Sequence, residues 1–266
     1  MTSNTELRGN VTAAPLTTER VPFGRLVKVE LRKLVDTRAG KWLLIAIALI
    51  TVAVVIIFAL AGHPSDMTFT HFVAATGTPQ GFLLPVLGIL AVTSEWSQRT
   101  GLVTFTLEPS RTRVLGAKFV ALIGLAVGFV VLALAVAALG NLLGMAARGG
   151  DGSWAFGVSG VRDILVLQLL GIVEGFAFGM LFMNSAAAIV LYFVLPTASS
   201  ILFNLVTWLQ DHLADWLDLG TTQSPLQDHS MNGSDWAHLA VTTLIWVILP
   251  LVLGYIRVLR SEVKSS

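Results

Sequence analysis

The chain has 266 residues, of which 55% are hydrophobic and only 12% are charged, and its formal net charge is +1. A soluble domain of this length carries about twice that charged fraction, so the composition excludes an ordinary soluble protein. The chain contains no cysteine, which excludes disulfides, thiolate nucleophiles and thiolate metal sites. We therefore expect an all-α polytopic membrane protein.

The first 38 residues divide into two segments. Residues 1–21 are rich in Thr, Ala and polar residues, which is typical of a disordered tail. In 22–38, apolar side chains recur at three- and four-residue spacing, and the other faces carry the basic residues Arg25, Lys28, Arg32 and Lys33. This pattern predicts an amphipathic helix that lies in the membrane interface, with an ordinary solvated helix as the alternative.

Six apolar runs follow, each long enough to cross the hydrocarbon core, which takes roughly 20 residues of helix, and the third is long enough to tilt or to project beyond the bilayer. We place the spans at about 42–61, 69–94, 114–145, 162–182, 186–208 and 237–256, within one transmembrane domain of residues 22–260 that is followed by a short tail, 261–266. The second span contains Gly77, Pro79 and Gly81, which predicts a kinked or broken half.

A further short helix is expected outside the membrane, between the fifth and sixth spans. Leu209, Leu213, Trp216 and Leu217 stand there at helical spacing in an acidic segment without Lys or Arg. The apolar side chains would cover the outer surface of the bundle.

The distribution of basic residues predicts the orientation. With the six spans placed as above, 15 of the 17 Lys and Arg fall on one side, and only Arg148 and Arg162 fall on the other. Lys and Arg resist translocation, so the crowded side is cytoplasmic. We expect a multi-pass protein of the plasma membrane with both termini in the cytosol.

Glycines within the spans indicate close helix packing. Gly171, Gly175 and Gly179 stand four residues apart in the fourth span, a spacing that lets another helix approach in lipid. The third span has two similar pairs, Gly124 with Gly128 and Gly140 with Gly144.

Glu174 lies midway along the fourth span, where a carboxylate is costly and needs a partner, water or a proton. Asp163 precedes it on the same face. One interpretation is an acidic track that faces a translocation cavity, with Glu174 acting on cationic substrates. The other is a protonated Glu174 that is hydrogen-bonded to a neighbouring helix.

Two further patterns, one that resembles a protease motif and one that could suggest a metal site, are weaker indications of function. Gly157–Gly160 matches the GxSG motif of rhomboid-type intramembrane serine proteases, with Ser159 as the nucleophile and His238 at the start of the sixth span as its base. The five histidines lie on or near the external side without a recognised ligand spacing, so we predict no metal site; they are His63, His71, His212, His229 and His238. No Gly-x-x-x-x-Gly-Lys-Ser/Thr loop occurs, so ATP-driven transport would need an ATPase on another chain.

Several segments occur in an order that resembles one family. Glu95–Gly101, Glu108–Arg111 and Lys118 resemble the first cytoplasmic loop of ABC-2 type transporter permeases, and 29–38 resembles the connecting helix of that family. Residues 181–189 resemble its turn between the fourth and fifth spans, although Met183 replaces the frequent Arg. The resemblance covers residues 22–260.

This resemblance implies partners and a coupling surface. Two ABC ATPase subunits, which carry ATP and Mg, would dock on 22–38 and on roughly 98–108, and the chain itself would bind no cofactor. The implied coupling residues are Glu95, Arg99, Gly101, Leu102, Val103, Phe105, Leu107, Glu108 and Arg111. Apolar side chains in a cytosolic loop need such a cover, and Glu95, Arg99 and Glu108 could pair across the interface. Ser110 is the expected N-cap of the third span.

The resemblance also implies a pathway between two permeases, a homodimer or a pair of paralogues, lined by the second and fifth spans. The polar residues expected there are Thr76, Thr78, Gln80, Thr93, Ser199, Ser200 and Asn204, with Glu174 from the fourth span. We predict a non-catalytic exporter subunit for a hydrophobic or amphipathic drug, peptide or lipid, with membrane lipids but no nucleic acid as further partners. The alternatives are an immunity or ion-extrusion exporter of the same architecture, a rhomboid-like protease, and a scaffold whose ATPase does mechanical or signalling work.

Overall fold

The computed structural model describes residues 21–97, 106 and 108–261, and these residues form helices without any strand. The long helices are α1 (Phe23–Asp36), α2 (Arg38–Ala61), α3 (Phe69–Ser97), α5 (Arg111–Arg148), α6 (Gly157–Phe182) and α7 (Ser185–Leu205). The remainder are η1 (Pro64–Asp66), α8 (Thr207–His212), α9 (Ala214–Leu217), α10 (Leu219–Gln227), α11 (Gly233–Thr243), the π-helical turn η2 (Leu244–Ile248) and α12 (Leu249–Arg260).

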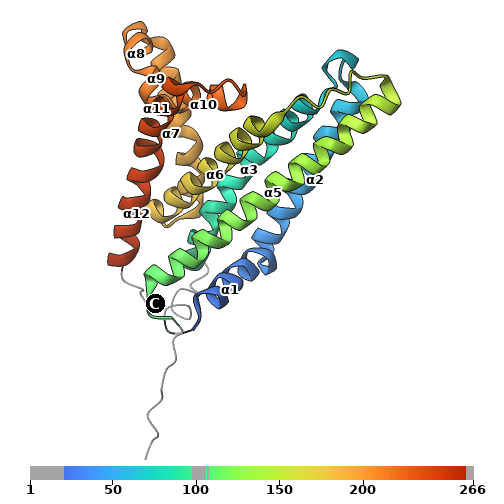
Figure 1. Ribbon diagram of the computed structural model, residues 1–266. Coiled ribbons are helices and arrows are strands. Elements are labelled where there is room, and N and C mark those ends of the chain that lie inside the picture. The colour runs from blue at the N-terminus through green and yellow to red at the C-terminus, as the bar shows by residue number, and fades with distance from the viewer. Residues whose placement is uncertain (1–20, 98–105, 107, 262–266) are drawn as a thin grey trace, which may run out of the picture.

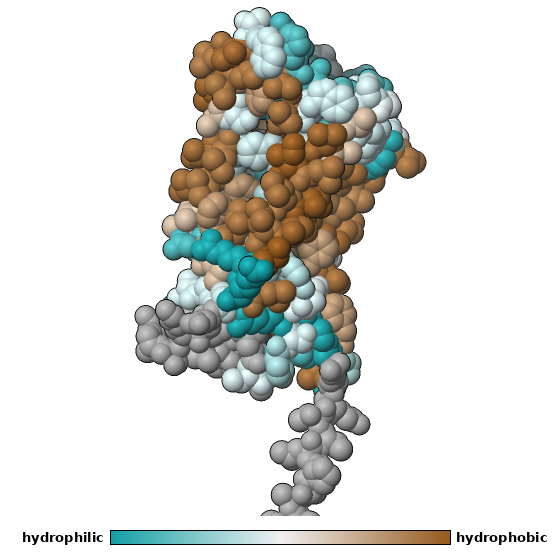
Figure 2. All heavy atoms as spheres, turned by 90° about the vertical axis from the view of Figure 1, so that its left-hand side faces the viewer, coloured by the Kyte–Doolittle hydropathy of each residue, from teal (hydrophilic) through white to brown (hydrophobic). Residues whose placement is uncertain are grey.

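Within these described residues, six helices are long and apolar enough to cross a membrane: α2, α3, α5, α6, α7 and the continuous run Gly233–Arg260. This confirms the predicted all-α class and the number of apolar spans. Figure 2 shows that one flank of the molecule is largely hydrophobic between two more hydrophilic ends. The exposed apolar side chains of the described residues include Val190 and Val194 of α7 and Val252 and Leu253 of α12, as expected for helices in contact with lipid.

The helices α2, α3, α5 and α6 run side by side, and α7 with α11 and α12 lean away from them (Figure 1). The short helices α8–α10 gather at one end of the bundle, which we call the α10 end. The opposite end, called the α1 end, holds α1, the start of α5 and the end of α12. The first and last described residues, Val21 and Ser261, both lie there. Arg113 donates to the carbonyl of Val21, and Arg111 donates to the carbonyl of Ser261.

The α3–α6 contact is close because the fourth span has glycines where α3 crosses it. A Cβ on Gly175 would collide with the carbonyl oxygen of Pro85, and one on Gly179 would lie 2.9 Å from the carbonyl oxygen of Ile89. The predicted role of this glycine ladder is confirmed.

The glycine pairs of α5 behave differently from each other. A Cβ on Gly140 would collide with Val55 and Phe72, which fits the predicted packing role. Gly124 and Gly128 have no atom within 4 Å of such a Cβ, so the prediction of close packing is wrong for this pair.

The helix α3 is continuous from Phe69 to Ser97 although it contains Pro79 and Pro85, so of the predicted kink or break, the break is wrong and the kink stays a prediction. Both prolines are buried between neighbouring helices, and the Thr76 and Thr78 hydroxyls donate to carbonyl oxygens of the preceding turn. Neighbouring helices and hydroxyl groups can compensate for a proline in a span in this way.

The segment between α7 and α11 holds three helices, where the sequence predicted one. The part that was not predicted, α10, lies beside α6 and α7. Asp218 begins it as an N-cap, accepting from the backbone N–H of Thr221 at 2.9 Å and from the hydroxyl groups of Thr221 and Ser200. The buried Asp218 carboxylate therefore fixes α10 to α7.

Candidate functional site

Four charged side chains form a buried ion cluster at the α1 end. Lys118 Nζ lies 2.6 Å from Glu30 Oε2 and 3.0 Å from Glu95 Oε1, and Lys33 Nζ lies 2.7 Å from Glu30 Oε1 and 3.0 Å from Glu95 Oε1. Glu30, Glu95 and Lys118 are each less than 10% exposed. We call this set of four residues the ion cluster.

The local sequence explains how α1 contributes to the ion cluster. Glu30 and Leu34 are one turn apart and face the bundle, whereas Arg25, Lys28 and Arg32 are exposed. Lys33, which was predicted to lie on the outer face with them, instead turns inward to Glu30 and Glu95. Side chains three residues apart on a helix are neighbours, so Lys33 reaches Glu30 within α1.

The charges of the ion cluster balance, with two carboxylates and two ammonium groups. Burial alone would lower the pKa of Lys33, but the hydrogen bond to Glu30 and the negative charges of Glu95 and Glu30 outweigh it and raise that pKa above 10.5. Removing one partner from such a set would leave a buried charge uncompensated. The ion cluster thus ties α1 to α3 and α5, although these charges lie far apart in the sequence.

The other charged residues predicted near the coupling loop are also engaged within the chain. Glu108 Oε2 lies 2.8 Å from Arg113 Nη1, and Arg111 donates to the carbonyl oxygens of Val258 at 2.6 Å and Ser261 at 2.7 Å, at the end of α12. Glu95 and Glu108 were expected to pair across an interface, but the structure pairs both inside the chain because each is buried.

Ser110 precedes α5 as predicted, but its side chain makes no capping hydrogen bond. Instead its backbone N–H donates to Glu108 Oε1 at 3.4 Å. The remaining predicted coupling residues lie outside the described residues, as do the tails 1–20 and 262–266; these coupling residues are Arg99, Gly101, Leu102, Val103, Phe105 and Leu107.

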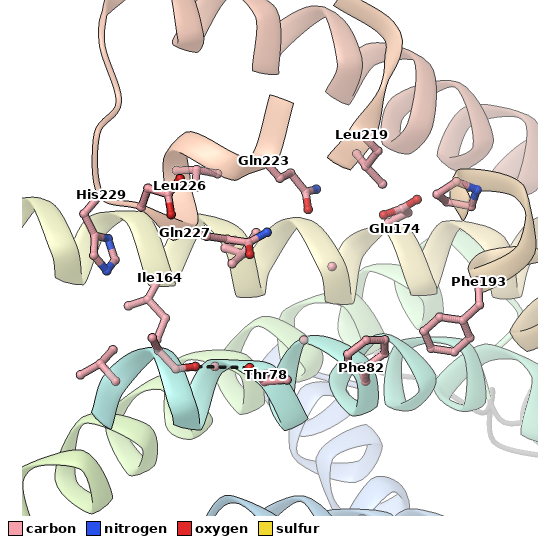
Figure 3. A pocket seen from close by; sticks show the side chains of 18 of the residues that line it. Thr78, Phe82, Ile164, Glu174, Phe193, Leu219, Gln223, Leu226, Gln227 and His229 are labelled. Atoms are coloured by element: carbon pink, nitrogen blue, oxygen red, sulfur yellow. Dashed lines mark hydrogen bonds between the residues drawn. The ribbon is translucent and has the colours of Figure 1, made fainter. Parts of the chain in front are cut away.

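A cavity of about 550 Å³ lies between α3, α6, α7 and α10, and Figure 3 shows side chains from these helices converging on it. The lining residues of α6 are Ile164, Leu167, Gly171 and Glu174, a stripe at three- and four-residue spacing on one helix face. Gln223, Leu226 and Gln227 of α10 cover another side. The cavity is in the size range of small-molecule sites.

Glu174 contributes the only carboxylate from a spanning helix among the described lining residues. Its side chain is 1% exposed, and its Oε1 atom has no hydrogen-bond partner. The predicted hydrogen bond from a neighbouring helix to this oxygen is therefore absent, and the carboxyl group faces the cavity. Asp163 does not line the cavity, because its Oδ1 atom pairs with Arg162 at 2.7 Å. The predicted acidic track is thus reduced to Glu174.

The α10 end of the cavity holds Asp228 and His229, which immediately follow α10. His229 has a left-handed backbone conformation, with φ of 53°, and its Nδ1 atom lies 3.6 Å from Asp163 Oδ2. Its ring packs edge-on against Phe156, with centroids 4.9 Å apart. These contacts hold the end of α10 against the start of α6.

The structure brings only some of the predicted pathway residues to this cavity. Thr78 and Glu174 line it. Gln80 instead donates to the carbonyl of Phe129 in α5 at 3.1 Å, Ser200 donates to Asp218, and Asn204 donates to the carbonyl of Ser200. Ser199 is half-buried in α7 and is not a lining residue; Thr76 and Thr93 are buried and donate to carbonyls of their own helix.

Sequence reasoning missed the aromatic wall of the cavity. Phe82 of α3 and Phe193 of α7 are stacked with centroids 6.0 Å apart, and Tyr192 meets Phe193 edge-on at 4.9 Å. The available signal was the pair Tyr192-Phe193 near Pro196, within a span that also carries hydroxyl groups.

The weaker patterns are not assembled into sites in the described residues. Ser159 is exposed in the first turn of α6, and the His238 ring packs edge-on against Trp216 with centroids 4.3 Å apart, with no hydrogen bond between Ser159 and His238. Over the same described residues, no group of three or more His, Cys, Asp or Glu could hold a metal ion.

Comparison with known proteins identifies no relative: no family model matches the chain, and no curated protein matches it.

Proposed function

We propose that this chain is the membrane subunit of an ABC exporter, a permease without catalytic activity that moves a hydrophobic or amphipathic molecule using ATP hydrolysed by a separate subunit. The α1 end faces the cytosol of a plasma membrane, and two copies of the ATPase dock there. A second permease, identical or paralogous, completes the pathway. The resemblance of the loop after α3 to ABC-2 type permeases motivates this assignment.

The observation that carries the proposal is the ion cluster. An amphipathic helix beside a spanning bundle could simply rest on lipid, but α1 is joined by a part-buried ion pair to α3 and by a buried ion pair to α5. A push on α1 from a docked motor therefore moves two spans as one body, which is what rigid-body switching requires. The basic side chains Arg25, Lys28 and Arg32 remain exposed on α1 and are available to an acidic docking surface.

The cavity supports the same proposal. It is bounded by three spanning helices and is large enough for a drug-sized molecule. The lining combines apolar and aromatic side chains with a few polar groups, which suits an amphipathic cargo better than a freely hydrated one.

Co-purification tests the proposal directly. The tagged chain is extracted in a mild detergent after co-expression with its genomic neighbours, and we expect a P-loop ATPase to accompany it. Recovery of the bare chain alone under these conditions would remove the proposed function.

A matched pair of variants tests whether α1 is the docking element. Arg32→Glu reverses an exposed charge on α1, and Arg260→Glu reverses an exposed charge at the same end on α12. We expect the first to reduce the amount of co-purified ATPase several-fold, because interface charges contribute to docking, and the second to leave it unchanged. Equal effects would show that α1 has no specific part in docking.

A further inference from the structure

We propose that the cavity between α3, α6, α7 and α10 binds a lipophilic organic cation, with the positive charge against Glu174 and an aromatic body against Phe82, Tyr192 and Phe193. This inference rests on the proposed function and deepens it by naming the chemical class of the cargo. The cavity is closed on one side by α10, so the ligand is held between the spans and this cover (Figure 3).

The charge of the ligand follows from the lining. Glu174 is 1% exposed, and one of its oxygens has no hydrogen-bond partner. Among the described residues that line the cavity there is no Lys or Arg, and Asp228 adds a second carboxylate at the α10 end. A carboxylate in a span needs a partner. The described lining gives Glu174 no Lys or Arg, and a cationic ligand would supply the positive charge.

The shape of the ligand follows from the aromatic residues. The Phe82 and Phe193 rings are inclined by 29° to each other and the Tyr192 and Phe193 rings by 88°, and all three residues line the cavity. Organic cations gain free energy over aromatic faces, most when they are desolvated. A flat or propeller-shaped aromatic cation uses these surfaces and Glu174 together.

Two rival ligand classes fit the lining less well. A bare metal cation requires several oxygen ligands, whereas Glu174 and Asp228 are the only carboxylates among the described lining residues, and no group of three or more His, Cys, Asp or Glu in that part of the chain could hold a metal ion. An anionic lipid headgroup requires Lys, Arg or clustered backbone N–H donors, and the described lining offers no basic side chain except His229.

Binding to the purified chain tests the inference without any ATPase. The chain is placed in nanodiscs of zwitterionic lipid, and binding of radiolabelled tetraphenylphosphonium is measured at equilibrium. We expect saturable binding that triphenylphosphine oxide, an uncharged analogue, does not displace. Glu174→Gln should weaken it by about tenfold or more, because a buried charge pair is lost, and Glu174→Asp should retain most of it.

Asp211→Asn is the matched control, because it also converts a carboxylate to an amide, but at an exposed position of α8 that does not line the cavity. We expect less than about a twofold change, since an exposed charge is screened. Equal weakening by Asp211→Asn and Glu174→Gln, unchanged binding in Glu174→Gln, or equal competition by the uncharged analogue would each overturn the proposal.

The two proposals fail separately. Binding without a co-purifying ATPase would keep the cation site and remove the exporter assignment. A co-purifying ATPase without tetraphenylphosphonium binding would keep the exporter assignment and remove the cargo class. Glu174→Gln replaces an unpaired buried carboxyl with a neutral isostere, so we expect it to fold, and its thermal unfolding in the same nanodiscs verifies this.

Discussion

Lys118 Nζ lies 2.6 Å from Glu30 Oε2, and both side chains are about 5% exposed. The pair joins the start of a spanning helix to an amphipathic helix that precedes the first span. Because Glu95 and Lys33 complete the ion cluster, the four residues act as one unit, and the consequence of removing any one depends on the charges that remain.

We predict that Lys118→Met lowers the free energy of unfolding by about 3 kcal/mol, because it removes a buried ammonium group that lies 2.6 Å from Glu30 and 3.0 Å from Glu95. Lys28→Met is the control: it removes an exposed ammonium group of α1 that lies outside the ion cluster, and exposed charges contribute about 1 kcal/mol or less. Thermal unfolding of both variants in one detergent compares them. Equal losses of unfolding free energy in the two variants would show that the ion cluster contributes no more to stability than the charge removed in the control.

A double variant separates charge from packing at the same site. Lys118→Met combined with Glu30→Gln removes one charge of each sign, so we expect it to be more stable than Lys118→Met alone. Interaction between contacting residues is non-additive for this reason. If the two losses simply add, the cost of Lys118→Met comes from its packing and not from the uncompensated carboxylate.

The glycine contacts predict opposite responses to the same added methyl group. Gly175→Ala would drive a Cβ into the carbonyl of Pro85, whereas Gly128→Ala adds one in open space. We expect Gly175→Ala to cost roughly 1–3 kcal/mol or more by overpacking the α3–α6 contact. Gly128→Ala should be neutral or stabilising by about 0.5–1 kcal/mol, because alanine favours helix.

Expression level and thermal unfolding of these two variants provide the measurement. A small effect of Gly175→Ala, similar to that of Gly128→Ala, would mean that α3 and α6 can separate without cost. That outcome would contradict the close packing of α3 against α6 at this glycine.

The spans were predictable because each is a long apolar run, and their number is confirmed. The ion cluster was not, although Glu95, Lys33 and Lys118 were all singled out in the sequence. Hydrophobic periodicity placed Lys33 on the outer face of 22–38, but its partner Glu95 stands 62 positions away, and such a pairing cannot be derived from the local pattern. Long-range pairing of charges overrode the amphipathic pattern.

The cavity was predictable only in part, for a related reason. Thr78 and Glu174 attract notice because polar groups in a span need partners, and both line the cavity. The aromatic wall, formed by Phe82, Tyr192 and Phe193, cannot be distinguished in the sequence from the other apolar residues of the spans. The covering helix α10 contains Gly220, Pro225 and several Thr and Ser residues, which disfavour helix locally; the Asp218 N-cap and its contacts with α7 determine its position.

The raised pKa of Lys33 predicts a pH dependence of stability. A lysine whose pKa is raised by folding contributes stability that is fully present below its unfolded pKa, near 10.5, and lost as the pH rises through the folded value. We expect wild type to unfold at a higher temperature than Lys33→Met at about pH 8, and the difference to shrink towards about pH 11.

Lys28→Met is the control for this measurement, since Lys28 is exposed on the same helix and outside the ion cluster. Its unfolding temperature should follow that of wild type at both pH values. A difference between wild type and Lys33→Met that stays constant with pH would assign the effect of Lys33 to its methylene groups and not to its ammonium charge.

The absence of cysteine makes the orientation directly measurable, because any single introduced cysteine is the only target of a maleimide. Ser97→Cys places one at the end of α3 near the ion cluster, and Asp151→Cys places one at the opposite end, after α5; both positions are exposed. We expect a membrane-impermeant maleimide to label Asp151→Cys on intact cells and Ser97→Cys only after permeabilisation, because 15 of the 17 Lys and Arg lie on the Ser97 side.

Labelling of both variants after permeabilisation controls for access. The absence of labelling in the cysteine-free parent controls for specificity. Labelling of Ser97→Cys on intact cells would put α1 and the ion cluster outside. A cytosolic ATPase could then not reach Arg25, Lys28 or Arg32, and the exporter assignment would fail. The cation site would survive that result, because Glu174 lies within the spans and its binding test on the isolated chain is independent of which end faces the cytosol.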